Sequence, residues 1–156
     1  MKKVLMCVLL IGGIGIAGFL PFNGTDVAKL HPVEVLVVNH IDGKYIIKTD
    51  TGMVGIGADA DAAIEDLKLT APGDVFLETA NYILVGKECA HISVLFYDYL
   101  RPACQVYILD GDGELKKIAR YLENHPSEAT ILSCRQGVAS PTKLVIDGEV
   151  RRVVYQ

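Results

Sequence analysis

The sequence predicts an α+β fold, with a mixed sheet and about three helices that follow an N-terminal apolar signal or anchor helix. The first twenty residues are apolar after a basic start, the remainder alternates between β-branched runs and helical patterns, and Gly-containing turns separate these segments. The chain has 156 residues, of which 51% are hydrophobic and 22% charged. This length suits one domain, and this composition excludes an intrinsically disordered chain.

The N-terminus carries the signature of a targeting or anchoring segment. Lys2 and Lys3 precede 17 uncharged residues, 4–20, a length that fits both a long secretory signal and a short transmembrane helix. Basic residues before an apolar segment keep the N-terminus in the cytoplasm. We therefore expect a signal or membrane-anchor segment at 1–24, with membrane attachment through 4–20. A single extracytoplasmic α/β domain is expected at 25–156, at the cell membrane or secreted.

The first part of this domain reads as a hairpin, a short strand and a helix. Residues 33–39 are rich in valine, and an Asp-Gly turn at 42–43 separates them from a second β-branched run at 45–49. A short glycine-flanked strand follows at 53–57. Residues 58–69 have helical spacing of apolar side chains, with aspartates that can cap the helix at its start.

The second part of the domain continues the alternation of predicted strands and helices. Residues 75–85 predict one long or two short strands, and 88–100 predict a buried amphipathic helix that ends before a proline. An apolar strand is expected at 104–109 and a helix at 114–125, before a second proline. A final hairpin, turning at an Asp-Gly pair, occupies 142–155.

Charge excludes one class of partner. The two leader lysines are the only charged residues before Asp26, so the remainder holds 13 basic and 19 acidic residues and a net charge of -6. A nucleic-acid-binding protein needs a basic surface to replace the counterions of the phosphates, so no nucleic-acid partner is expected. The same average charge predicts no attraction to anionic lipid, which leaves the apolar segment as the membrane attachment.

Two groups of residues are candidates for catalysis in a small exported enzyme. Asp50, Asp59 and Asp61 flank a glycine-rich stretch and could form an acidic site, although turn and helix-cap roles explain the same residues. Cys134 precedes Arg135, whose charge could favour a reactive thiolate, whereas a buried inert cysteine is the commoner case. No metal or cofactor site is expected.

Three cysteines follow the apolar segment. Outside the cytoplasm a disulfide is permitted, and Cys89 with Cys104 is a sensible pair, which would leave Cys134 as an unpaired thiol. Tyr97, Tyr99 and Arg101 are candidates for a protein interface, because tyrosine and arginine are enriched there. Core packing is the competing interpretation of the tyrosines.

The order of segments resembles the N-terminal domain of the Ger(x)C family, the C-subunit lipoproteins of spore germinant receptors. The resemblance covers 33–125 and is carried by the valine-rich strand, the glycine-rich strand at 52–57, ANYILVGKE at 80–88 and YDYLRPACQVYIL at 97–109. It implies a membrane-surface accessory protein of endospore-forming bacteria, without catalysis. The family's lipid-accepting cysteine has no counterpart here, and the family continues into further domains.

These sequence observations are compatible with three functions. The first is a non-enzymatic, membrane-associated or exported accessory module that binds a protein partner at the membrane, in spore germination or sporulation. The second is a small exported enzyme that uses Cys134 or the acidic group. The third is an exported domain of unknown role. We expect the first.

Overall fold

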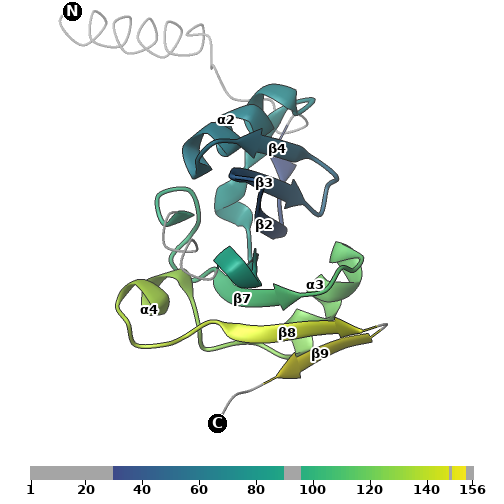
Figure 1. The fold of residues 1–156 in the computed structure, drawn as a ribbon, viewed down its shortest axis with the longest axis vertical. Coiled ribbons are helices and arrows are strands. Elements are labelled where there is room, and N and C mark those ends of the chain that lie inside the picture. The colour runs from purple at the N-terminus through teal and green to yellow at the C-terminus, as the bar shows by residue number, and fades with distance from the viewer. Residues whose placement is uncertain (1–29, 90–95, 148, 154–156) are drawn as a thin grey trace, which may run out of the picture.

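The structure is a computed structural model that describes residues 30–89, 96–147 and 149–153. The predicted signal or anchor segment lies outside this range. Within it, no helix combines the length and apolar character needed to cross a membrane. The described residues form a mixed seven-stranded sheet, in the order β4-β3-β2-β6-β7-β8-β9, with three α-helices (Figure 1), which confirms the predicted fold class.

A three-stranded antiparallel unit forms one end of the sheet, built from the predicted hairpin and the predicted short strand that follows it. β2 (Val35–Ile41), β3 (Lys44–Thr49) and β4 (Val54–Gly57) follow one another along the chain and pair in that order. Asp42 and Gly43 turn the chain between β2 and β3 with φ angles of 51° and 74°. Both angles are left-handed, as the tight hairpin turn with an Asp-Gly pair requires.

Helix α2 (Ala60–Thr70) packs directly on β4. Its N-cap is Asp59, whose carboxylate accepts a hydrogen bond of 2.8 Å from the backbone N–H of Ala62. Asp66 and Thr70 of the helix reach the free edge of β4. Asp66 accepts from the N–H of Ile56 at 2.8 Å, and Thr70 donates to the carbonyl of Val54 at 3.3 Å. The helix therefore occupies backbone groups that an exposed edge strand would offer to another chain.

The 75–85 segment forms two strands, separated by a short 3-10 helix, η2 (Leu77–Thr79). β5 (Asp74–Phe76) pairs in parallel with a short strand that the sequence analysis missed, β1 (Leu30–Pro32), in a separate two-stranded sheet. β6 (Tyr82–Gly86) lies parallel to β2 in the large sheet. Much of the helix predicted at 88–100 lies outside the described residues; residues 87–89 and 96–99 form short turns.

The rest of the chain completes the sheet. β7 (Gln105–Asp110), α3 (Leu115–Asn124), β8 (Thr142–Asp147) and β9 (Glu149–Val153) agree with the predicted elements. β6, β7 and β8 run parallel, and β9 returns antiparallel to β8. A five-residue helix that the sequence analysis missed, α4 (Ile131–Arg135), precedes β8.

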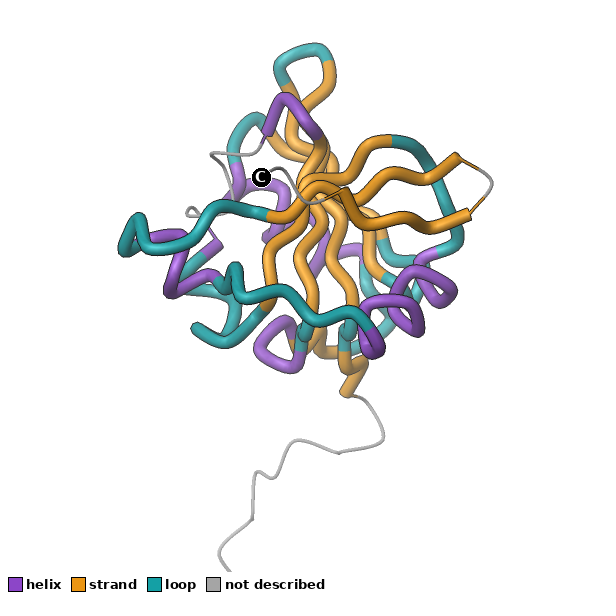
Figure 2. The backbone as a smooth tube through the Cα atoms, turned by 90° about the horizontal axis from the view of Figure 1, so that it is seen from below, coloured by secondary structure: helices purple, strands orange, loops and turns teal. Residues whose placement is uncertain are grey.

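The large sheet is twisted (Figure 2). Side chains that alternate along its strands divide the core between its two faces. On one face α2 buries Ile64 and Leu67 against Leu36 of β2 and Ile83 of β6. The opposite face carries the second apolar cluster, in which α3 covers β2, β6, β7 and β8. Its central members are Leu84, Tyr107, Ile118, Leu122 and Leu144.

Candidate protein-binding site

The residues proposed from the sequence as an interface lie in the connection between β6 and β7. The backbone N–H groups of Tyr99 and Leu100 both donate to the carbonyl of Phe96, at 3.1 and 3.0 Å, and so close a tight turn. Phe96 and Leu100 are buried in the core and fix the turn to the α2 side of the sheet. Tyr97 and Tyr99 are consequently half-buried, with part of each ring at the surface.

Each of the three residues has a partner that holds it. The hydroxyl of Tyr99 donates to the Asp61 carboxylate at 2.8 Å, which joins the turn to the first turn of α2. The guanidinium of Arg135 lies 4.0 Å from the ring centroid of Tyr97. Arg101 donates to the side-chain carbonyl of Asn81. The three side chains are therefore ordered before any partner arrives, which lowers the entropy cost of binding.

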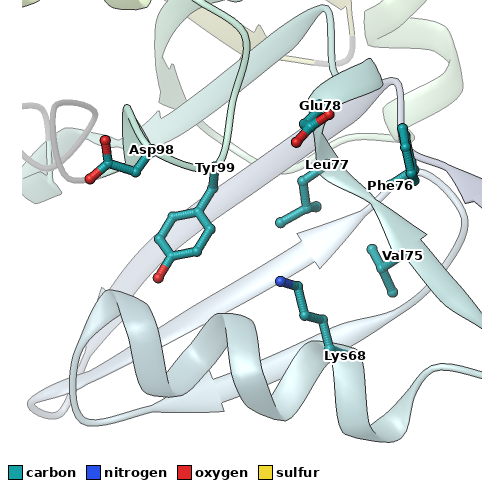
Figure 3. A pocket seen from close by; sticks show the side chains of 7 residues that line it. All are labelled: Lys68, Val75, Phe76, Leu77, Glu78, Asp98 and Tyr99. Atoms are coloured by element: carbon teal, nitrogen blue, oxygen red, sulfur yellow. The ribbon is translucent and has the colours of Figure 1, made fainter.

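Tyr99 forms one wall of a pocket on this surface, which we call the tyrosine pocket (Figure 3). The pocket has a volume of about 230 Å³ and is lined by residues from α2, β5, η2 and the turn at 96–100, which we call the tyrosine turn: Lys68, Val75, Phe76, Leu77, Glu78, Asp98 and Tyr99. The Lys68 ammonium points into the space between Tyr99 and Leu77. Drug-sized and cofactor ligands usually occupy about 300–1,000 Å³, so this pocket suits a single side chain of a partner better than a cofactor.

The surroundings of the pocket are acidic. Donation of the Tyr99 hydroxyl to Asp61 raises the pKa of Tyr99 above its ordinary value, and burial and the charges of Asp61, Glu65 and Asp98 add to this effect. The phenol therefore remains a hydrogen-bond donor at physiological pH. Lys68 is the one basic side chain that lines the pocket, and no carboxylate in the described part of the chain lies within ion-pair distance of it.

The acidic site proposed from Asp50, Asp59 and Asp61 is not assembled. Asp50 follows β3 and accepts hydrogen bonds from the N–H groups of Glu34 and Val35, at 3.1 and 3.3 Å. Asp59 lies two residues beyond Gly57, which pairs with Tyr45 at the other end of the β3–β4 hairpin. The hairpin thus separates Asp50 from the two helix-start aspartates. Across the described segments, no three His, Cys, Asp or Glu side chains gather in a way that could hold a metal ion.

The Cys89–Cys104 disulfide suggested by the sequence is not formed, and both residues are free, buried thiols. Cys104 precedes Gln105, which pairs with Tyr82 at the start of β6, whereas Cys89 lies beside the backbone of His40 near the other end of the parallel strands. Five residues of strand separate these levels, which amounts to about 16 Å. A disulfide needs Cα atoms within about 7 Å. Burial raises the pKa of Cys104 to about 12, which keeps it an unreactive thiol.

Cys134 lies on α4 in a setting that does not activate it. Burial raises the pKa of its thiol, and the hydrogen bond with Ser133 offsets only part of that increase. The neighbouring Arg135 guanidinium, which the sequence analysis assigned to the thiolate, packs on Tyr97 instead.

We expect iodoacetamide to modify Cys134 more slowly in the native protein at neutral pH than in the urea-unfolded protein. The folded thiol holds its proton to a higher pH, so native labelling should accelerate only as the pH is raised above the ordinary thiol range. Mass spectrometry of timed reactions measures both rates. Fast, selective labelling of native Cys134 would instead support the enzyme interpretation.

Sequence reasoning found Tyr99 but missed the rest of the pocket. Lys68, Phe76 and Glu78 are brought to it by the packing of α2 against β5 and η2, and nothing in their spacing along the chain signals that meeting. Comparison with family models, with curated proteins and with solved structures finds no match to this chain.

Proposed function

We propose that this chain is a membrane-associated module of the extracytoplasmic side, or a secreted one, that acts by binding a protein partner and not by catalysis. The observation that carries the proposal is the tyrosine pocket. It combines an aromatic side chain held by a hydrogen bond, Tyr99, with an apolar wall and a small volume, which are the features of a pocket that receives an anchor residue of another protein.

The remaining support comes from the surface around the pocket and from the leader. Phe76, which lines the pocket, is 41% exposed although it is a large apolar side chain. Lys2 and Lys3 before the apolar 4–20 segment support export and attachment to a membrane. The resemblance of 33–125 to the Ger(x)C N-terminal domain suggests spore germination or sporulation as the setting.

A photo-crosslinking amino acid in place of Phe76 tests the pocket in cells that make the full chain. We expect one discrete adduct with another protein, because position 76 would lie against the anchor residue of the partner. The matched control is the same amino acid in place of Val138, which is 77% exposed and follows α4. Asp98→Arg reverses an exposed charge at the pocket and should reduce the adduct from position 76.

Three outcomes would contradict the proposal. They are an identical adduct pattern from positions 76 and 138, no adduct from position 76, or an adduct that Asp98→Arg leaves unchanged. Circular dichroism of each variant separates loss of binding from loss of fold.

A further inference from the structure

The three-stranded unit has one covered face and one open face. α2 packs on the side of the unit where Ile47 and Gly55 lie. Because side chains alternate along a strand and directly paired residues share a face, the other side carries the pairs Ile41–Lys44, Ile46–Ile56 and Lys48–Val54, next to the half-buried Asn39 and the buried Val37 of β2. The six residues of the three pairs are called the open face.

No described helix covers this surface. α3 packs on the same side of the large sheet, in one cluster with residues of β2, β6, β7 and β8, and it reaches as far as a pocket that it shares with Asp50, just after β3. It leaves Ile41, Val54 and Ile56 exposed. The exposed fractions of Ile41, Val54 and Ile56 are 52%, 41% and 48%. Such a group of adjacent exposed aliphatic side chains marks a surface that meets another apolar phase.

The charge of the open face is opposite to that of the protein. Lys44 and Lys48 are its only ionisable residues; both are exposed, and neither forms an ion pair with a carboxylate of the described residues. The α2 helix on the opposite side carries three carboxylates, Asp61, Glu65 and Asp66, against one lysine, Lys68. The net charge of -6, from which no attraction to anionic lipid was expected, therefore hides a basic apolar surface on one side of the molecule.

The composition of the open face fits lipid better than protein. The centres of protein interfaces are enriched in aromatic residues and arginine and depleted in lysine, whereas the open face holds isoleucine, valine and lysine. A lysine lays its aliphatic stem along apolar surface and extends its ammonium to the polar layer, which suits the boundary between acyl chains and anionic headgroups. The tyrosine pocket, in contrast, has an aromatic wall.

We propose that the open face lies against an anionic lipid surface. This inference rests on the proposed function in one respect, because the apolar 4–20 segment brings the domain to the membrane. Nine residues, 21–29, separate that segment from β1, and they can span up to about 30 Å. This reach is three times the spacing of about 10 Å between packed layers, so it is long enough for the open face to turn toward the membrane. With the open face on lipid, the tyrosine pocket on the α2 side faces away from the membrane, toward a partner.

The test uses the full chain with a genetically encoded fluorescent amino acid at position 56 and vesicles that contain brominated lipid, which quenches on contact. Vesicles are made of phosphatidylcholine alone or mixed with phosphatidylglycerol. The matched control places the same amino acid at position 69, where Leu69 is 85% exposed on the outer side of α2. We expect quenching at position 56 but not at 69, and only with phosphatidylglycerol. Lys44→Gln with Lys48→Gln should lower the ratio of docked to undocked domain by about 30-fold.

Flotation of the same samples separates the two proposals. A chain that floats with both vesicle types but shows no quenching at position 56 overturns the lipid-facing surface and leaves the anchor intact. Quenching that is equal at positions 56 and 69, or insensitive to phosphatidylglycerol and to the lysine substitutions, also overturns it. A concentration-dependent change in emission at position 56 without quenching would assign the open face to a protein contact instead. A chain that binds neither vesicle type contradicts both proposals.

Discussion

Replacing Gly55 with alanine is expected to lower the free energy of unfolding by about 3 kcal/mol or more. A Cβ atom at this position would lie 2.2 Å from the carbonyl oxygen of Ala63 and 2.6 Å from the Cβ of Leu67. Both obstacles belong to the buried side of α2 and one is backbone, so the helix itself would have to move away from β4. Gly57 has the same constraint, since its added Cβ would lie 2.2 Å from the backbone nitrogen of Ala63.

Urea unfolding followed by circular dichroism measures this loss. The control is Val54→Ala, because Val54 lies on the same strand and its side chain points to the open face of the sheet, away from α2. We expect that variant to lose less than about 1 kcal/mol. A Gly55→Ala protein as stable as the Val54→Ala protein would show that α2 does not lie as close to β4 as the structure has it.

Truncating Tyr107 is the second change with a large expected effect. Tyr107 is fully buried between the sheet and α3, in one cluster with Ile118 and Leu122, and its hydroxyl donates to the side-chain carbonyl of Gln105 at 2.8 Å. Tyr107→Ala should lower the free energy of unfolding by about 3–5 kcal/mol, through lost burial and the cavity that remains.

Tyr107→Phe separates the hydroxyl from the ring. This variant keeps the packing and removes one hydrogen-bond donor, so the same urea experiment should show a loss of about 1 kcal/mol. Equal losses for Tyr107→Ala and Tyr107→Phe would contradict the assignment, because the hydroxyl and not the ring would then carry the stability.

Local patterns predicted most of the strands and two of the three helices. The Asp-Gly turn of the β2–β3 hairpin, the Asp59 cap of α2 and the apolar spacing of α3 are all decided by neighbours in the chain. The missed elements depend on distant partners. β1 has three residues and exists by pairing with β5, and α4 has five residues and begins at a capping box that uses Ser133 where glutamate or glutamine is usual.

The candidate sites were harder to predict, because each depends on how distant segments meet. Cys89 and Cys104 are close in sequence, but the parallel crossover between β6 and β7 places them at opposite ends of the strands. The tyrosine pocket is the converse case, because segments that are distant in the sequence meet there: α2, β5, η2 and the tyrosine turn. The average charge also gave no sign that Lys44 and Lys48 share one surface with exposed isoleucines.

The location of the native, full-length protein decides whether this chain is a membrane-associated extracytoplasmic module. Cells are fractionated, and intact cells stripped of their wall are treated with a protease that does not cross the membrane. We expect the protein in the membrane fraction or the medium, and we expect the membrane-bound form to be digested from outside. Full-length protein that is wholly soluble in the cytoplasm and protected from the protease would contradict it.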